Sequence, residues 1–204
     1  MTGPVRCLPP RWEEIDTVLL DMDGTLLDRH FDDHFWLDHV PGIYSCAKGL
    51  PLQQAKEELF ERYRSQEGTL NWTDLDYWSE ELGLDIPALK RQVEHLIDVH
   101  PFVRQFLDRL RETGRKVWLV TNAHGKTLDL KMEKTALAGE FDGVYTSQEM
   151  GAPKEDVLFW KRLRKELAFR PEGTLLVEDT EAVLETAASF GIRWLVYSKM
   201  SAMI

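Results

Sequence analysis

The 204-residue chain has only two cysteines, Cys7 and Cys46, and they are far apart in the sequence. A zinc or redox motif needs closely spaced cysteines, and a disulfide-stabilised secreted domain needs several pairs. The chain also lacks an apolar run near the ~20 residues that a membrane helix requires. Its first residues lack the apolar segment of a signal peptide. These absences predict a cytoplasmic protein that has no membrane as a partner.

Positive charge is scarce, since 25 Lys and Arg residues stand against 35 Asp and Glu residues, a formal net charge of −10. Binding to nucleic acid polymers or to anionic lipid needs a basic surface, so neither is expected as a partner. An anionic small molecule fits this composition only if a few residues supply local positive charge. The length suits one domain, or one domain with a sizeable insertion. The sequence leaves the oligomeric state open, and a monomer is favoured.

Short apolar runs, rich in Val, Leu and aromatic residues, have the length and composition of buried parallel strands. These runs are residues 17–20, 116–120, 143–146, 174–177 and 193–197. Helical patterns separate the last four runs, among them one over residues 181–190. We expect another helix, which opens at Pro101, directly before the run at residues 116–120. The alternation of strand and helix predicts an α/β fold with a doubly wound, Rossmann-like parallel sheet.

The interval between the first two predicted strands contains no convincing strand, and it is much longer than a simple crossover. Its apolar spacing predicts helices over residues 31–38, 52–67, 73–82 and 87–98. We therefore expect a helical cap inserted after the first strand. The cap is expected to comprise residues 31–99, and the α/β core to comprise residues 1–30 and 100–204.

Polar residues follow the predicted strands at their carboxyl ends, which is the edge of an open α/β sheet where ligands bind. Acids, hydroxyls and amides follow three strands, and one lysine opens the helix after another. These residues are Asp21, Asp23, Thr121, Asn122, Lys154, Glu178 and Asp179. The sequence therefore predicts that a site lies at this edge of the sheet.

Asp21 and Asp23 lie on either side of Met22, directly after the first apolar run. Two carboxylates so close repel each other unless a cation or a shared proton intervenes. An ordinary turn or helix cap needs one acid rather than two. Gly24 permits a backbone turn that a side chain would obstruct. The pattern favours covalent catalysis, with one Asp as nucleophile and the other as general acid and base.

Lys154 follows Pro153 at the start of a predicted helix, where the helix dipole disfavours a cation. A lone lysine is usually a solvated surface residue. Here, however, the acidic edge of the sheet needs a counter-charge, so we interpret Lys154 as a functional residue.

The segments DMDGT, LVTN, GAPKED and VEDT occur in the order and at the distances in which the chain resembles the phosphatases of the haloacid dehalogenase superfamily. The resemblance implies that Asp21 attacks the phosphoryl group to form an aspartyl phosphate. Asp23 would protonate the leaving oxygen and then activate water. Thr121 would bind the phosphate, and Lys154 would stabilise the nucleophile and the transferring group. Mg²⁺ would be held by Asp21, the backbone carbonyl of Asp23, and Asp179.

The last segment departs from the commonest form of this family, in which a second acid follows the metal-binding Asp by four residues. Val183 occupies that position here, and the additional acid is Glu178, directly before Asp179. Glu178 is therefore a candidate metal ligand, either direct or through the water ligands of the ion. Asn122, next to Thr121, is a further candidate for binding substrate.

The cap segments LLDRHFDDHFW and TLNWTDLDYWSEELGLDI, together with GAPKED, resemble the bacterial GMP/IMP nucleotidases of the same superfamily. This resemblance implies a Mg²⁺-dependent phosphomonoesterase whose small-molecule substrates are purine nucleoside 5′-monophosphates. Aromatic side chains stack well on a purine, and Trp36 and Trp72 are the candidates in the cap. The alternative reading is that any one cap aromatic belongs to the cap's own core.

Of four alternative functions, three fit the sequence less well and one fits it equally well. A dehalogenase would not need Asp23 or the acids of a metal site, and a phosphoacceptor signalling module lacks a long insertion after the first strand. A binding protein that had lost activity would lack a residue of the edge cluster. A sugar-phosphate phosphatase or a phosphomutase shares every catalytic residue and stays open as the alternative.

Overall fold

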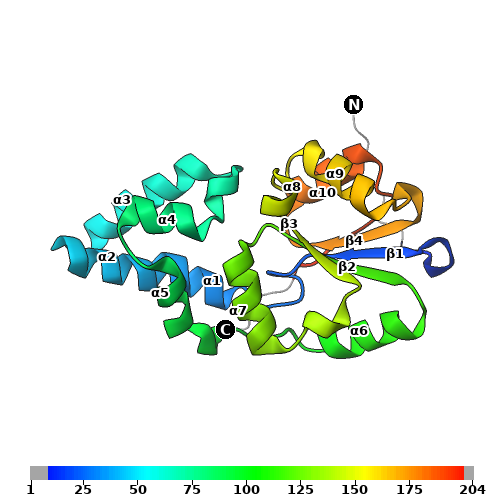
Figure 1. Cartoon of the computed structure of the whole chain (residues 1–204), viewed down its shortest axis with the longest axis horizontal. Helices are drawn as coiled ribbons and strands as arrows, with labels where there is room; N and C mark the ends of the chain where they lie inside the picture. Colours follow the sequence, from blue (N-terminus) through cyan, green and yellow to red (C-terminus); the bar gives the residue numbers. More distant parts are fainter. Residues whose placement is uncertain (1–8, 200–204) are drawn as a thin grey trace.

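A computed structural model describes residues 9–199, and in this range an α/β core lies beside a helical cap (Figure 1). The sheet of the core has the order β3-β2-β1-β4-β5, and all neighbouring strands are parallel. The strands are β1 (Thr17–Leu20), β2 (Lys116–Thr121), β3 (Gly143–Thr146), β4 (Thr174–Glu178) and β5 (Trp194–Tyr197). The predicted α/β fold is confirmed. Cys7 lies outside the described residues, and Cys46 is exposed.

Helices cover both faces of the sheet, as Figure 1 shows. On one face lie α6 (Val103–Glu112) and α7 (Gly125–Thr135), and on the other lie α8 (Ser147–Met150), α9 (Val157–Leu167) and α10 (Glu181–Phe190). In the central strand β1, Val18 and Leu20 pack into one apolar cluster and Leu19 into the other. This alternation is the two-residue period of a strand that is buried on both faces. The strand therefore holds the loop that follows it at a well-defined place.

The cap is helical, as the sequence predicts. It consists of α1 (His30–His34), the π-helical η2 (Phe35–His39), α2 (Val40–Lys48), α3 (Leu52–Gln66), η3 (Leu70–Trp72), α4 (Leu75–Leu82), α5 (Ile86–Gln92) and η4 (Glu94–Leu96). The predicted end of its first helix at residue 38 is wrong, because the helical run continues to Lys48. Pro41 lacks the amide hydrogen of a regular helix, and the wider π turn before it accommodates the ring.

The predicted start of a helix at Pro101 is also wrong, since α6 begins at Val103. Phe102 has a left-handed backbone with φ of 68°, which cannot belong to a right-handed helix. Its side chain is 78% exposed and so does not pack with Phe106 and Leu107 on the face of the helix that meets the sheet.

The two chain segments that lead into and out of the cap lie side by side. Leu27 pairs with Val99 in an antiparallel bridge, and the His100 amide donates to the carbonyl of Leu26 at 3.0 Å. The chain thus enters and leaves the cap at neighbouring positions, shortly after the Asp21–Asp23 turn. We propose that the boundaries between core and cap lie at this bridge, near the predicted residues 30 and 100.

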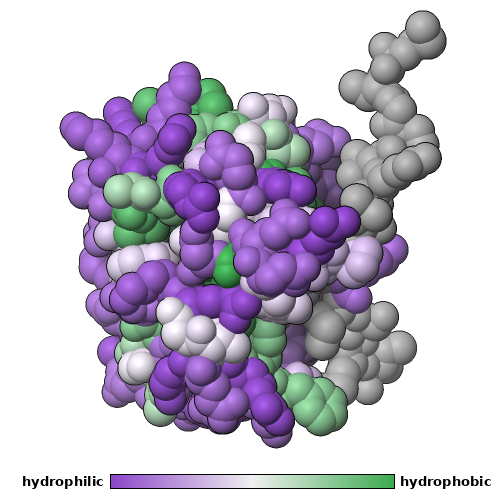
Figure 2. Space-filling view, turned by 90° about the vertical axis from the view of Figure 1, so that its right-hand side faces the viewer, coloured by the Kyte–Doolittle hydropathy of each residue, from purple (hydrophilic) through white to green (hydrophobic). Residues whose placement is uncertain are grey.

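The end of the core away from the cap has a mostly hydrophilic surface. Figure 2 shows hydrophobic residues there in small, separate areas, apart from what the grey atoms cover. Between residues 9 and 199, no helix has both the length and the apolar character needed to cross a bilayer. A cavity lies elsewhere, between core and cap.

Candidate active site

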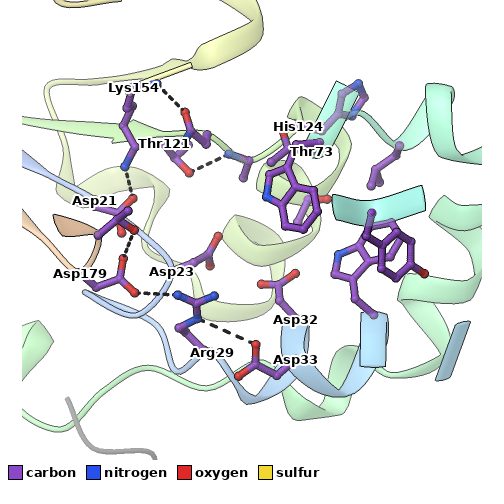
Figure 3. A pocket seen from close by; sticks show the side chains of 18 of the residues that line it. Asp21, Asp23, Arg29, Asp32, Asp33, Thr73, Thr121, His124, Lys154 and Asp179 are labelled. Atoms are coloured by element: carbon purple, nitrogen blue, oxygen red, sulfur yellow. Dashed lines mark hydrogen bonds and ion pairs between the residues drawn. The ribbon is translucent and has the colours of Figure 1, made fainter. Parts of the chain in front are cut away.

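A cavity of about 370 Å³ lies between the carboxyl ends of the strands and the cap. All the site residues predicted from the sequence line it. They are Asp21, Asp23, Trp36, Trp72, Thr121, Asn122, Lys154, Glu178 and Asp179. The fold therefore brings together, in one cavity, residues from four separate parts of the core and two parts of the cap. Figure 3 shows the arrangement.

Lys154 lies between two buried carboxylates at the base of the cavity. Its Nζ is 2.5 Å from Asp21 Oδ1 and 2.7 Å from Glu178 Oε2. Burial alone would lower the pKa of Lys154, but the charges of Asp21 and Glu178 outweigh burial and raise it above its usual value. Burial raises the pKa of Asp21 and raises that of Glu178 to about 8, an increase that the Asp21 charge reinforces. Lys154 thus supplies the local positive charge that an anionic substrate requires.

One oxygen of Asp21 is left without a partner. Asp21 Oδ2 is buried and accepts no hydrogen bond from any described residue, and an orphaned buried acceptor is costly. Carboxylate oxygens of Asp21, Glu178 and Asp179 lie within 4.8 Å of one another. Mg²⁺ binds through a small number of carboxylate oxygens and retains water ligands. The residues present therefore fit a divalent cation next to Asp21.

Glu178 already uses both of its oxygens. Oε2 accepts from Lys154, and Oε1 accepts from the amides of Asp179 and Thr180, each at 3.1 Å. The carboxylate thus holds the lysine and the turn after β4 in place. Asp179 is more accessible and meets the cavity directly.

The turn after β1 can approach Asp179 only because it contains Gly24. This glycine has φ of +82°, and a Cβ at this position would lie 2.0 Å from Asp179 Oδ2. Any side chain would therefore push the two carboxylate-bearing loops apart. The glycine of the DMDGT segment is required by close contact as well as by backbone conformation.

Thr121 is the last residue of β2 and Asn122 follows it, and the two side chains differ in what they bind. Thr121 Oγ1 accepts from the amide of Ala123 at 3.0 Å, and its hydroxyl hydrogen stays available. The Asn122 side chain accepts from the Lys154 amide and donates to Glu155, both at 2.9 Å. Asn122 thus fastens the loop that carries Lys154, and its predicted contact with substrate stays a prediction.

Asp23 belongs to a second charged cluster that the sequence analysis missed. Its Oδ1 accepts from Lys131 on α7 at 2.5 Å, and Lys131 also binds Asp32 of the cap. Asp32 in turn accepts from Lys90 at 2.7 Å. Burial raises the pKa of Asp23 to about 6, although Lys131 opposes this. The sequence shows only that Thr127, Lys131 and Thr135 are polar residues at helical spacing, and their burial is seen only in the structure.

Arg29 is another residue that was not predicted. Its guanidinium donates to Asp179 Oδ2 at 3.1 Å and lies 3.9 Å from Asp33, as Figure 3 shows. It lies in the segment that enters the cap, so it adds positive charge to the same side of the cavity as Asp179.

Aromatic rings form the cap wall, but they are not equally accessible. Trp78 is 1% exposed and donates its Nε1 hydrogen to the carbonyl of Trp72. Trp36 and Tyr63 pack edge to face with centroids 5.4 Å apart, and Tyr63 packs on Trp78 in the same way. Trp72, by contrast, is 40% exposed. Trp72 therefore offers the most free ring surface to a ligand, while Trp78 belongs to the core of the cap.

The chain is similar to a known family and to known proteins over most of its length. The haloacid dehalogenase-like hydrolase family matches residues 15–191. The GMP/IMP nucleotidase YrfG of Escherichia coli K12 is 41% identical over 183 residues, which cover 90% of this chain and 82% of that protein. The pyrophosphatase PpaX of Bacillus velezensis is 22% identical over 176 residues, which cover 82% of this chain and 76% of that protein.

Solved structures share the fold. A haloacid dehalogenase-type phosphatase from Thermococcus onnurineus superposes with a TM-score of 0.79 at 25% identity, covering 90% of this chain and 86% of its own. A β-phosphoglucomutase, assigned with reservation, from Thermotoga maritima superposes with a TM-score of 0.64 at 21% identity, covering 89% and 84%. The second similarity bears on the fold alone.

Proposed function

Since the chain belongs to the haloacid dehalogenase-like hydrolases and is a phosphatase, we propose that it hydrolyses purine nucleoside 5′-monophosphates such as GMP and IMP with the help of Mg²⁺. The observation that carries the chemistry is the state of Asp21. One of its oxygens is held by Lys154, and the other is buried at the base of the cavity and has no partner among the described residues. A carboxylate so placed can act as a nucleophile or a metal ligand.

In the first half of the reaction, an Asp21 oxygen forms a bond to phosphorus while the bond from phosphorus to the ribose 5′ oxygen breaks. The proton on Asp23 moves to that 5′ oxygen, and the nucleoside leaves. The raised pKa of Asp23 keeps a fraction of its carboxyl groups protonated near neutral pH, as a general acid requires. Lys154 stays charged throughout and neutralises the anionic groups around it.

In the second half, Asp23 takes a proton from a water molecule whose oxygen attacks phosphorus. The bond between Asp21 and phosphorus breaks, which releases inorganic phosphate and restores the nucleophile. Asp21, Asp179 and the backbone carbonyl of Asp23 would hold Mg²⁺, which when bound supplies positive charge to the transferring phosphoryl group. Thr121 would bind a phosphate oxygen through its free hydroxyl hydrogen.

Glu178 is proposed to position Lys154 rather than to bind the metal directly. This role is supported by its hydrogen bonds, since both oxygens are already used by Lys154 and by two backbone amides. A buried carboxylate that orients a catalytic group is a common arrangement near metal sites.

The purine preference is supported by the identity to the Escherichia coli nucleotidase and by the cap wall. The core residues in the cavity are used for phosphoryl transfer, so a preference among esters must come from the cap. Trp72, with Trp36 beside the same cavity, offers ring surface on which a base can stack. The cavity volume of about 370 Å³ lies within the range of small-molecule sites.

The test is phosphate release from GMP, IMP, glucose 6-phosphate and glycerol phosphate, each with Mg²⁺ and with excess chelator. We expect the highest kcat/KM for the two nucleotides, and activity only with the metal. A purine-to-sugar ratio of kcat/KM near one would reject the nucleotidase and leave a general phosphatase. A ratio below one would favour a sugar-phosphate phosphatase or phosphomutase.

A further inference from the structure

The charged cluster of Lys131, Asp23, Asp32 and Lys90 joins core and cap, and all of its members except Lys131 line the cavity. Both lysine side chains are buried, and each ammonium is paired with Asp32. Removing charges from water is costly, and apolar residues of similar volume often serve stability equally well. Of these residues, the proposed reaction uses only Asp23, so it does not explain why Lys131, Asp32 and Lys90 are charged.

The two oxygens of Asp23 have different surroundings. Oδ1 accepts from Lys131, whereas no described residue hydrogen-bonds Oδ2. The Asp23 side chain stays 27% exposed and lines the cavity. Lys131 therefore fixes one oxygen and leaves the other open toward the place of the substrate.

Lys131 itself is held from the cap side. Its ammonium lies 5.3 Å from the centre of the Phe31 ring and pairs with Asp32, and both residues belong to α1. Lys90 of α5 pairs with the same carboxylate and lies 4.7 Å from the Phe31 ring. In Figure 1, α7 lies between the sheet and these cap helices. The position of Lys131 thus depends on how the cap is seated on α7.

We propose that Lys131 is a positioning residue of the reaction, which directs Asp23 at the leaving oxygen and which Asp32 holds in place only when the cap is seated. The inference rests on the proposed phosphatase mechanism, in which Asp23 gives its proton to the leaving group. It links closure of the cap over a substrate to the readiness of the catalytic acid.

A purely structural role for these ion pairs predicts something different. If the cluster only joined cap and core, its loss would slow every substrate alike. If Lys131 directs a proton donor, substituting it must slow the reaction more for a leaving group that needs a proton than for one that does not. A nucleoside 5′ oxygen is a strong base and must be protonated as it leaves, whereas 4-nitrophenolate leaves without a proton.

The experiment therefore compares IMP with 4-nitrophenyl phosphate for Lys131→Met in single-turnover reactions with enzyme in excess. This design measures release of the leaving group separately from hydrolysis of the phosphoenzyme. We expect inosine release to slow by about 100-fold and 4-nitrophenolate release by less than about 5-fold, because general acid catalysis contributes on this scale. In steady-state reactions, we also expect an unchanged KM for IMP. Equal losses for the two substrates would overturn the inference.

Lys134→Met is the matched control, since Lys134 lies on the same helix and pairs with Glu94 of the cap at 3.7 Å, but is partly exposed. It should behave as the unaltered protein with both substrates. A loss with IMP as large as that of Lys131→Met would show that any contact between α7 and the cap has this effect, and would also overturn the inference.

Asp32→Asn tests whether the cap holds Lys131 in place. It also replaces Lys131→Met as the test variant if Lys131→Met does not fold. We expect the release of inosine from IMP to slow by about tenfold and the release of 4-nitrophenolate to be little changed. The reason is that Lys131 still pairs with Asp23 but no longer pairs with the cap. The double variant should be no slower than Lys131→Met, because Asp32 acts through Lys131. Full activity of Asp32→Asn with IMP would refute the role of the cap.

Asp21→Asn separates this inference from the proposed function. If it retains turnover with both substrates, the phosphatase mechanism itself fails. If it is inactive while Lys131→Met slows both substrates equally, only the role of Lys131 fails.

Discussion

The core side and the cap side of the cavity hold their side chains in different ways. On the core side, Lys154 and Glu178 are almost fully buried and joined by an ion pair at the ends of buried strands. On the cap side, Trp72 lies on a short 3₁₀ turn and keeps much of its ring exposed. Groups that must transfer a phosphoryl group need fixed positions, whereas a surface that selects a substrate needs free area. The comparison predicts that core variants change the rate and cap variants change the choice of substrate.

The largest effect is expected from Asp21→Asn, because an amide cannot attack phosphorus. We expect kcat to fall by at least about 10⁴-fold with every phosphate ester, as is typical when a nucleophile is removed. The measurement is phosphate release, with thermal unfolding as the check that the fold persists. Substantial turnover in a variant that unfolds normally would contradict the assignment.

Trp78→Ala tests whether a cap aromatic can serve stability without serving substrate choice, because Trp78 lines the cavity but is buried against Tyr63 and Trp36. We expect the free energy of unfolding to fall by about 3–5 kcal/mol, as for a large aromatic removed from a core. The preference for purine over sugar phosphates should change little in the protein that stays folded. Denaturant unfolding and a specificity ratio measure the two quantities.

Asp179→Asn and Glu178→Gln compare two adjacent acids on the core side. We expect Asp179→Asn to raise the Mg²⁺ concentration for half-maximal activity more than Glu178→Gln does, because the Asp179 carboxylate is the more exposed of the two and Glu178 is held by Lys154 and by two backbone amides. Substituting a residue that only orients a metal ligand typically lowers the metal affinity by about 10- to 100-fold. Magnesium titration of activity and of thermal stability gives both values. Equal effects would make Glu178 a direct ligand.

Trp72→Ala should give the smallest of these effects and the most selective one. Loss of base stacking is expected to cost about 1–3 kcal/mol, which lowers the purine-to-sugar ratio of kcat/KM by about 5- to 100-fold. Trp12→Ala is the matched control, since Trp12 is also 40% exposed but lies outside the cavity. If the purine-to-sugar ratio falls for neither variant, Trp72 does not contact the base, and Trp36→Ala would then be the next substitution to measure.

Much of the fold and of the core site could be predicted because the signals are local. The short apolar runs predict strands, and parallel strands bring their carboxyl ends to one edge, so Asp21, Thr121 and Asp179 meet without any detailed packing. The helices of the cap were predicted less well. The first cap helix was predicted to end at residue 38, yet a π turn carries the helical run past Pro41 to Lys48. That outcome depends on how the cap packs, which a local pattern does not contain.

The sequence by itself determined the order of strands and helices, the insertion after β1, and the residues that gather at the edge of the sheet. Only the tertiary structure decided the state of individual atoms. It left Asp21 Oδ2 without a hydrogen bond from residues 9–199, and it used both the oxygen and the nitrogen of the Asn122 side-chain amide. It also placed Lys131 against Asp23 across 108 positions of the chain. The physical reason is that a hydrogen bond requires atoms within about 3 Å of each other. Between distant segments, that distance is set by the packing of whole helices on the sheet.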